Sequence, residues 1–267
     1  MKKKYQIALT IAGSDSGGGA GIQADLKTFM YHKCYGMSVI TSLTAQNTTG
    51  VLGIHPVPED FVRLQLEAVL SDIGTDAVKT GMLYSAELIE TISNVLQKYK
   101  IENLVIDPVM VAKGGAKLLQ LNAISTLKNQ LIPLAAIVTP NIPEAELMAD
   151  MSIKNIEDMK KACINIAKLG CKTILLKGGH LPSQIVTDIF YDKVNNEFTE
   201  LTSDFIESKN VHGTGCTLSA AICANLALGN SIYESVKNAH SYINTAIRFG
   251  KEYEIGSGHG PVNHFCQ

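Results

Sequence analysis

Short apolar runs rich in β-branched residues alternate along the chain with longer segments in which apolar positions repeat at helical spacing. The short runs predict strands at Tyr5–Ala12, Met37–Thr44, Ala77–Thr80, Leu104–Asp107, Ala136–Thr139 and Thr173–Lys177. The longer segments predict helices at Ile22–His32, Glu59–Ser71, Ala86–Tyr99, Ala123–Leu131 and Glu157–Leu169. Asn155 and Ser231, each three residues before an acidic residue, can cap helix starts. This alternation is typical of an α/β fold in which helices connect parallel strands.

The pattern changes after Lys177. Val186–Tyr191 and Glu197–Thr202 alternate polar and apolar residues, which predicts a hairpin at the edge of the sheet. Helices are predicted at Gly213–Ala227 and Ile232–Phe249, and the glycine-rich segment after them is expected on the surface. The sequence contains no repeat, low-complexity tract or long linker, so residues 1–267 are expected to form a single domain.

Composition narrows the function classes. A hydrophobic fraction of 46% in 267 residues can form one large core. The balance of 23 Lys+Arg against 25 Asp+Glu lacks the basic excess of a nucleic-acid binder. Six scattered cysteines without a C-x-x-C pair indicate neither a structural metal nor a disulfide framework. No apolar run is long enough to cross a membrane, and the lysine-rich start passes directly into a strand, so we expect a cytoplasmic protein without a membrane partner.

A glycine-rich loop, Gly13–Gly21, follows the first predicted strand and leads into a helix that carries Asp25. A loop at this end of a strand faces the ligand crevice of an open α/β sheet. Its glycines do not match the G-x-G-x-x-G dinucleotide fingerprint, and no P-loop motif occurs in the sequence. A plain strand-to-helix turn is an equally good interpretation of this loop.

A second pair of glycines, Gly213 and Gly215, opens a helix of small apolar residues. Backbone N–H groups at a helix start lack partners within the helix and suit an anionic phosphoryl group. Cys216 falls in the first turn, where the helix dipole is expected to lower the thiol pKa and favour a thiolate that can accept a hydroxyl proton. The alternative is that glycine and cysteine only allow close helix packing.

Asn141 and Glu144 lie where a predicted strand passes into a helix. Their spacing is suited to a hydrated Mg²⁺, which binds few carboxylates in addition to waters and phosphates. A first-turn acid that only complements the helix dipole is an equally good interpretation. Asp107 is a further carboxylate at a strand end, weak evidence by itself.

These segments occur in one order that resembles the ribokinase-like superfamily. They are the Gly13–Asp25 segment, Lys79-Thr80-Gly81-Met82, Asp107-Pro108-Val109-Met110, Asn141-x-x-Glu144 and Gly213-Thr214-Gly215-Cys216. Over nearly the whole chain, the sequence is most similar to the hydroxymethylpyrimidine/phosphomethylpyrimidine kinases of thiamin biosynthesis. The resemblance implies a three-layer α/β/α ribokinase-like fold with a mostly parallel central sheet. It also implies transfer of the γ-phosphoryl of ATP, with Mg²⁺, to the pyrimidine and then to its monophosphate, by an enzyme that is frequently a homodimer.

The resemblance assigns residues by motif. It implies a pyrimidine pocket of Gly13, Asp25, Gln46, Met82 and Val109, in which Gln46 pairs with the amino and nitrogen edge of the ring. It implies a nucleotide site near Asn141 and Lys177, with Glu144 close to Mg²⁺. It also implies an anion hole formed by Gly213, Thr214, Gly215 and Cys216. Cys216 stands where most of the superfamily has an aspartate base.

Three alternative functions remain. A pyridoxine or pyridoxal kinase of the same fold is disfavoured by Gln46 and by Ala112, because the related pyridoxal kinases carry a second cysteine in the loop that holds Ala112. A non-catalytic vitamin or nucleotide sensor is disfavoured by intact Asn141, Glu144 and Cys216. A cysteine hydrolase using His212 as its base is disfavoured because neighbouring residues at a helix start rarely face each other. His212 is instead expected to shape the anion hole.

Overall fold

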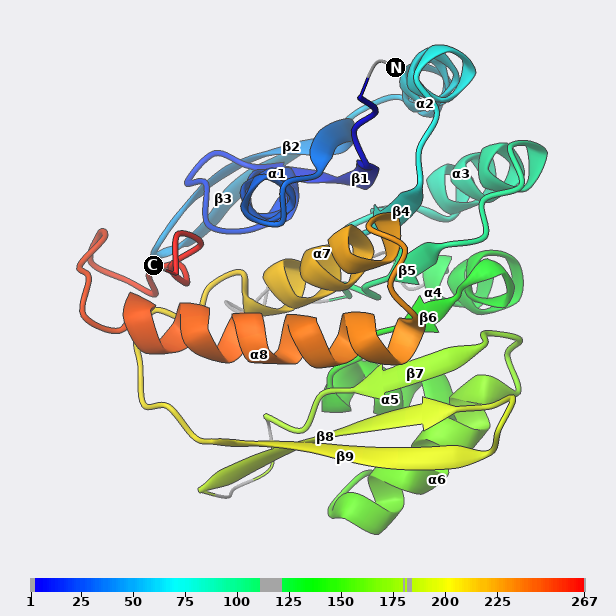
Figure 1. Ribbon diagram of the computed structural model, residues 1–267. Helices are drawn as coiled ribbons and strands as arrows, with labels where there is room; N and C mark the ends of the chain where they lie inside the picture. Colours follow the sequence, from blue (N-terminus) through cyan, green and yellow to red (C-terminus); the bar gives the residue numbers. More distant parts are fainter. Residues whose placement is uncertain (1–2, 111–121, 180, 182–183, 267) are drawn as a thin grey trace.

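The computed structural model describes residues 3–110, 122–179, 181 and 184–266, which form one nine-stranded sheet (Figure 1). The strand order is β3-β2-β1-β4-β5-β6-β7-β8-β9. The strands are β1 (Ile7–Asp15), β2 (Tyr35–Asn47), β3 (Gly50–Pro56), β4 (Ala77–Thr80), β5 (Leu104–Ile106), β6 (Ile137–Val138), β7 (Thr173–Leu176), β8 (Ile185–Asp192) and β9 (Glu197–Asp204). Strands β2, β1, β4, β5, β6 and β7 run parallel, while β3, β8 and β9 add antiparallel edges.

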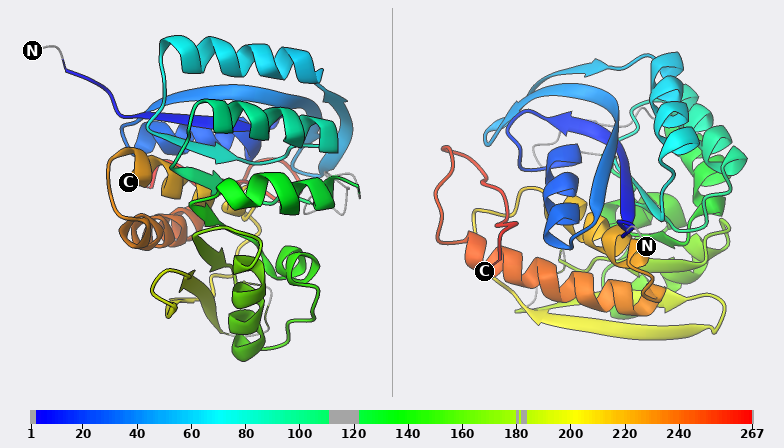
Figure 2. Two further views of the ribbon diagram at one scale, coloured as in Figure 1. Left: turned by 90° about the vertical axis from the view of Figure 1, so that its right-hand side faces the viewer. Right: turned by 45° about the horizontal axis from the view of Figure 1, so that its top comes forward.

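Helices cover both faces of the sheet (Figure 2). They are α1 (Gly21–Tyr31), α2 (Glu59–Asp72), α3 (Ala86–Lys98), α4 (Ala123–Thr126), α5 (Ile142–Ala149), α6 (Ile156–Ala167), α7 (Thr214–Ala227) and α8 (Ile232–Gly250), with a π turn at Leu127–Leu131 and a 3₁₀ turn at Ile132–Leu134. Helices α1, α7 and α8 share one core cluster with the sheet, and α2, α3, α5 and α6 share the other. The expected three-layer α/β/α fold with a mostly parallel sheet is confirmed.

Strand β1 lies inside the sheet, between β2 and β4, and both of its faces are buried. Leu9 and Ile11 belong to one core cluster, while Ala8, which precedes them and faces the other side of the sheet, belongs to the other. Continuous burial of this kind is typical of a parallel strand covered by helices on both sides. Helix α7 is buried from Thr217 to Ala227 because it lies between the sheet and α8. Its small residues therefore allow close packing, as the second interpretation of the Gly213–Ala227 segment required.

Most predicted elements are confirmed, with shifts of a few residues at their ends. The Asn155 and Ser231 side chains accept the backbone N–H groups of Asp158 (2.9 Å) and Glu234 (3.2 Å), so both predicted caps are present. Strand β3 was not predicted, because its side chains are mostly exposed and two glycines interrupt its alternation. It forms a hairpin with β2. The last residues of β2 extend past the end of its pairing with β1 and pair with β3 alone.

The order in which successive strands are added to the sheet reverses between β1 and β4. Strand β1 pairs with β2 on one side and with β4 on the other, so the connections leave from both sides of this pair. Ligands of open α/β sheets bind outside the carboxyl ends of the strands at such a point. Here those ends lead to Gly13 after the regular part of β1, Met82 after β4 and Asp107 after β5, with Asn141 and Lys177 following β6 and β7.

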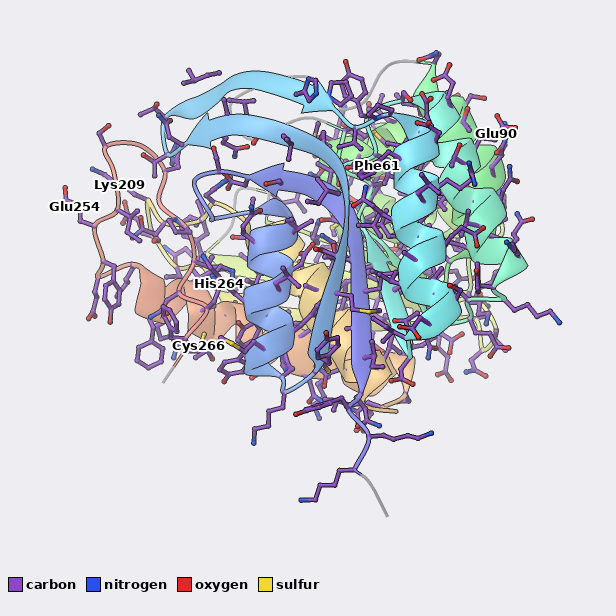
Figure 3. All side chains as sticks on the ribbon, turned by 90° about the horizontal axis from the view of Figure 1, so that it is seen from above. Phe61, Glu90, Lys209, Glu254, His264 and Cys266 are labelled. Atoms are coloured by element: carbon purple, nitrogen blue, oxygen red, sulfur yellow. The ribbon has the colours of Figure 1, made fainter. Side chains whose placement is uncertain are left out.

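The segment after α8 returns to this edge of the sheet. Figure 3 shows His264 and Cys266 beside α1, close to α8. The His264 ring lies 3.0 Å from the Thr217 hydroxyl of α7. The surface position expected for this segment is therefore only partly correct, since Val262, His264 and Cys266 are buried.

Candidate active site

The start of α7 is packed against the loop that precedes α1. Gly213 caps the helix with a φ of 77°, and a Cβ at this position would collide with the carbonyl oxygen of Gly19. Only glycine combines this left-handed conformation with such a close approach. The amino ends of α1 and α7 therefore meet, and both contribute positive partial charge to one place.

Two amides in the first turn of α7 are available to a ligand. The Thr214 N–H points to the Val211 carbonyl at 3.4 Å. Within the described part of the chain, the N–H groups of Gly215 and Cys216 have no hydrogen-bond partner. The predicted anion hole is thus compatible with the geometry, and its available donors are concentrated at Gly215 and Cys216.

Replacing Gly213 by alanine is expected to reduce turnover by at least about 10²-fold, because the displaced helix start would move the Gly215 and Cys216 amides. Gly229, at the other end of α7, is a matched control with a φ of 85° and open space around its Cα. Gly229→Ala should cost only about 1 kcal/mol of backbone strain and leave turnover unchanged. Steady-state kinetics and urea unfolding of both variants test this, and equal activities would show that the Gly213–Gly19 contact is dispensable.

The predicted activation of Cys216 is wrong for the unliganded protein. Burial raises the pKa of the Cys216 thiol to about 11, although Lys79 nearby acts in the opposite direction. The Asp25 and Asp107 carboxylates raise this pKa further. The helix start does supply a favourable local field, but removal of the thiol from water outweighs it. Cys216 therefore carries its proton at neutral pH before substrate arrives.

Lys177 lies beside the start of α7. Its Nζ is 3.2 Å from Asp107 Oδ1, and the lysine side chain is mostly buried. A Cβ on Gly215 would approach both Lys177 Nζ and the Asp107 carboxylate. The absence of a side chain at Gly215 thus opens a direct path from this ammonium to the amino end of α7. That Lys177 reaches nucleotide phosphates stays a prediction.

Asn141 and Glu144 form a reciprocal cap at the start of α5. Asn141 Oδ1 accepts the Glu144 N–H at 2.9 Å, and Glu144 Oε2 accepts the Asn141 N–H at 2.8 Å. Burial raises the pKa of Glu144 to about 7, which Lys177 partly opposes and Asp107 reinforces. The interpretation of Asn141 and Glu144 as residues that stabilise a helix start is therefore correct. It does not exclude the metal, because Mg²⁺ keeps most of its waters and needs one or two nearby carboxylates.

The residues expected in the pyrimidine pocket divide into two groups. Gly13, Met82 and Gln46 lie along the crevice, and Gly13 leaves room for the Ser42 hydroxyl and the Met82 sulfur. Asp25, in contrast, is fully buried and forms an ion pair with Lys79, whose Nζ lies 2.8 and 2.9 Å from the two carboxylate oxygens. In this structure Asp25 therefore lies beneath the surface of the crevice, where it holds Lys79 in position.

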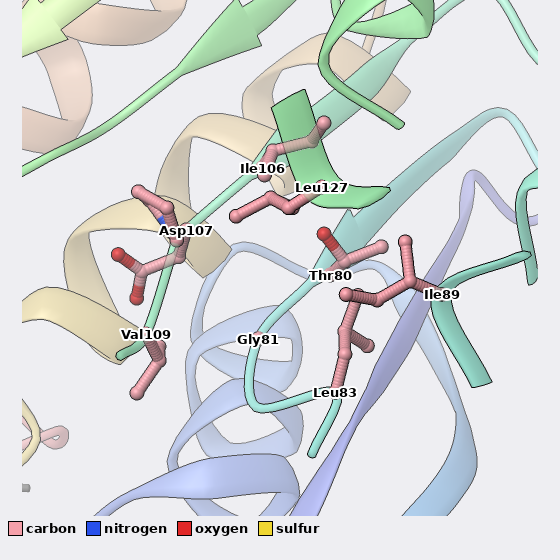
Figure 4. Close-up of a pocket in the computed structure, with 9 residues that line it drawn as sticks. Thr80, Gly81, Leu83, Ile89, Ile106, Asp107, Val109 and Leu127 are labelled. Carbon is pink, nitrogen blue, oxygen red and sulfur yellow. The ribbon is translucent and has the colours of Figure 1, made fainter. Parts of the chain in front are cut away.

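Val109 and Asp107 lie side by side after β5, along a small pocket that continues inward to Thr80 and Leu127 (Figure 4). The Thr80 hydroxyl is buried and has no hydrogen-bond partner within the described residues. Val109 is half-buried, as a residue that contacts a ring substrate would be. Ala112, which was used against aldehyde capture, lies outside the described residues.

The glycine loop after β1 is closed by its own aspartate. Asp15 accepts the N–H groups of Gly17 (2.8 Å), Gly19 (3.0 Å) and Ala20 (2.8 Å) through its two carboxylate oxygens. These three amides are therefore not available to an anionic monophosphate. Burial would raise the pKa of Asp15, but His212 and the loop amides lower it overall, so the carboxylate is ionised.

His212 faces Asp15 rather than Cys216. Its Nε2 lies 3.0 Å from Asp15 Oδ2 and 3.1 Å from the side-chain nitrogen of Gln46. This arrangement disfavours a cysteine–histidine pair further, since the imidazole is engaged elsewhere. This contact could not be predicted from local sequence patterns, because Asp15 and His212 are 197 residues apart.

Comparison with known proteins agrees with this geometry. The family described as phosphomethylpyrimidine kinase matches residues 15–263. The hydroxymethylpyrimidine/phosphomethylpyrimidine kinase of Bacillus subtilis is 47% identical over 260 residues, which cover 97% of this chain and 94% of that protein.

Two solved structures are also similar. The phosphomethylpyrimidine kinase of Clostridium difficile is 48% identical with a TM-score of 0.80, covering 90% of this chain and 98% of that one. The pyridoxal kinase of Staphylococcus aureus in complex with AMP-PCP and pyridoxal is 37% identical with a TM-score of 0.90, covering 99% and 95%. Among the described residues of this chain, no helix is long and apolar enough to span a membrane.

Proposed function

The chain belongs to the phosphomethylpyrimidine kinase family, and on this basis we propose which residues of its crevice bind the pyrimidine, the nucleotide and the transferred phosphoryl group. The activity is ATP-dependent phosphorylation of 4-amino-5-hydroxymethyl-2-methylpyrimidine to its monophosphate and then to its diphosphate, in thiamin biosynthesis. The observation that carries the proposal is the pair of amides at Gly215 and Cys216, which have no partner among the described residues, next to the mostly buried Lys177 side chain. All three groups favour negative charge at one place.

The transferred phosphoryl group is proposed to sit at the start of α7. The Gly215 and Cys216 amides face its oxygens, and Gly213 and Thr214 hold the turn in position. Lys177 and Asn141 lie on the nucleotide side of this point. The substrate hydroxyl gives its proton to the thiolate form of Cys216, whose own proton has first left to solvent; the hydroxyl oxygen bonds to the γ-phosphorus, and the bond to the bridging oxygen of ADP breaks. Positioning and charge stabilisation supply most of the acceleration of such a reaction.

Magnesium is proposed to bind near Glu144. When bound, it would neutralise charge on the nucleotide phosphates. The Glu144 carboxylate already accepts backbone hydrogen bonds from Asn141 and Met110, so it would hold the ion most readily through water. Asp107 lies near enough to Glu144 and Lys177 to influence the pKa of both groups. It would therefore provide a second carboxylate close to the metal.

The ring pocket is proposed to contain Gly13, Gln46, Met82 and Val109, with Asp25 supporting it through Lys79. A pyridoxal kinase is the second candidate, because the similar Staphylococcus aureus protein carries that name. Gln46 favours the pyrimidine, since an amide can pair with an amino group and an adjacent ring nitrogen at once. Pyridoxal offers oxygen atoms instead of an amino donor.

The wider setting is also proposed. We expect one domain over residues 1–267, because a single sheet spans the described residues. We expect no nucleic-acid partner, because the near-neutral charge of −2 lacks a basic excess. We expect a cytoplasmic location, because all six cysteines are free. The homodimer is proposed from the family resemblance alone. Light scattering of the purified protein would test the dimer.

The decisive experiment incubates the protein with ATP, Mg²⁺ and hydroxymethylpyrimidine, with pyridoxal in a parallel reaction, and separates the products by chromatography. We expect pyrimidine monophosphate followed by diphosphate, both abolished when a chelator removes Mg²⁺. Product from pyridoxal alone would overturn the assignment of the ring pocket. Monophosphate without diphosphate would contradict the second step.

A further inference from the structure

Three side chains from distant parts of the chain meet at the edge of the ring pocket. His212 Nε2 lies between Asp15 Oδ2 (3.0 Å) and the Gln46 side-chain nitrogen (3.1 Å). On its other side, the Gln46 side-chain oxygen lies 3.2 Å from the Thr44 hydroxyl. The backbone of Gln46 is also held, because Ser16 Oγ donates to its carbonyl (2.8 Å) and accepts its N–H (2.9 Å).

Counting protons fixes the state of the imidazole. The Asp15 carboxylate is ionised and can only accept hydrogen bonds. His212 Nε2 must therefore carry a proton, since two acceptors would repel each other at 3.0 Å. A protonated Nε2 cannot accept a hydrogen from the Gln46 amide, so an NH₂ group facing it would leave two donors opposed.

The Thr44 hydroxyl resolves the conflict. It has one hydrogen, and the Ser14 carbonyl lies 2.9 Å away to accept it. Thr44 Oγ1 then offers only lone pairs to Gln46. Turning the Gln46 amide by 180° removes the opposed donors, because the amide oxygen then shares the single Nε2–H of His212 with Asp15 in a three-centre hydrogen bond and the NH₂ donates to Thr44. Such exchanges of oxygen and nitrogen are decided by the hydrogen-bond network.

We propose that Asp15 and His212 are positioning residues that fix this orientation of the Gln46 amide and thereby select an aminopyrimidine. This inference rests on the proposed ring pocket. The locked amide presents one free lone pair and one free N–H on its outer edge. An amino group beside a ring nitrogen matches both in a bidentate pair, whereas a ring that lacks the amino group leaves the amide oxygen unpaired.

The backbone around His212 is built to hold the ring there. The His212 N–H donates to the Gly260 carbonyl (3.0 Å), and its carbonyl accepts the Val262 N–H (3.3 Å). Gly19 has no side chain where a Cβ would strike the imidazole. The same segment reaches the β2–β3 turn, where the His259 N–H donates to the Thr48 carbonyl (2.8 Å). Residues 258–262 therefore tie His212 to the hairpin that carries Gln46.

The test compares two substrates in three proteins. The substrates are hydroxymethylpyrimidine and its analogue without the 4-amino group, and the proteins are wild type, His212→Leu and His212→Gln. The ratio of kcat/KM for the two substrates measures recognition of the amino group. In His212→Leu this ratio should shrink by about 3- to 10-fold, the worth of one neutral hydrogen bond, through the KM for the pyrimidine. His212→Gln keeps an N–H donor and should restore it.

The controls separate this role from others. His259→Leu removes an exposed imidazole of the same segment and should leave the ratio unchanged. A ratio that stays constant in His212→Leu while both rates fall would overturn the proposal. If wild type does not phosphorylate hydroxymethylpyrimidine, the proposed function fails instead. Nitrogen NMR of the wild-type histidines gives a second measurement, in which an unprotonated His212 Nε2 contradicts the proposal even if His212→Leu does not fold.

Discussion

Replacing Cys216 by alanine is expected to slow turnover by about 10²- to 10⁴-fold while leaving the KM for ATP nearly unchanged. A general base contributes about this factor, and the thiol is not expected to contact the nucleotide base or sugar. Steady-state kinetics with ATP and hydroxymethylpyrimidine measure both quantities. Cys223→Ala is a matched control, because Cys223 is buried in the same helix away from the start of α7.

The pH profile refines this prediction. Burial raises the pKa of Cys216 to about 11, so the thiolate fraction increases about tenfold with each pH unit between 7 and 10. The value of kcat/KM should therefore rise with pH in wild type, and Cys216→Ala should lose that rise. A wild-type rate for Cys216→Ala would remove the base assignment. A flat wild-type profile of kcat/KM, which reports the free enzyme, would contradict a base with the raised pKa of Cys216.

Replacing Lys79 by methionine is expected to destabilise the protein by about 3–5 kcal/mol. Lys79 and Asp25 are both fully buried, and the substitution would leave the Asp25 carboxylate without its counter-charge. The Thr10 hydroxyl, 2.6 Å from Asp25, would remain as its hydrogen-bond donor and cannot replace a positive charge. Urea unfolding measures the loss.

Two further variants show whether the loss of unfolding free energy comes from the unpaired buried charge. Lys98→Met breaks an exposed pair with Glu67 and should not move the unfolding midpoint. The double variant Asp25→Leu/Lys79→Met should regain most of the stability, because an apolar pair fills the space without a buried charge. It should nevertheless remain impaired in turnover if Asp25 supports the pyrimidine pocket. A fully active double variant would show that the pair serves stability alone.

The sequence predicted those features that depend on neighbours along the chain. Strand ends such as Thr80 and Asp107, and the caps at Asn155 and Ser231, follow from local patterns of apolar and capping residues. Strand β3 lacked such a pattern, because neither of its faces is consistently buried. The Asn141–Glu144 motif was found, but the sequence could not show that its two side chains cap each other.

Features that depend on distant residues were missed or wrong. The helix start favours a thiolate at Cys216, yet Asp25 and Asp107 approach it from α1 and from the end of β5 and add to the effect of burial. Asp15 also occupies three amides of the glycine loop, a local contact that the spacing of the glycines did not indicate. The contact between Asp15 and His212 joins residues that only the folded sheet brings together.

The return of residues 258–262 to the crevice sets a limit on when the enzyme can become competent during synthesis. Gly258 donates its N–H to the Thr48 hydroxyl across 210 residues of sequence, whereas β1 and β2 are adjacent in the chain. The β2–β3 turn therefore gains these contacts only after residues 258–262 have been synthesised, so the ring pocket is completed late, after the strands that carry most of its residues.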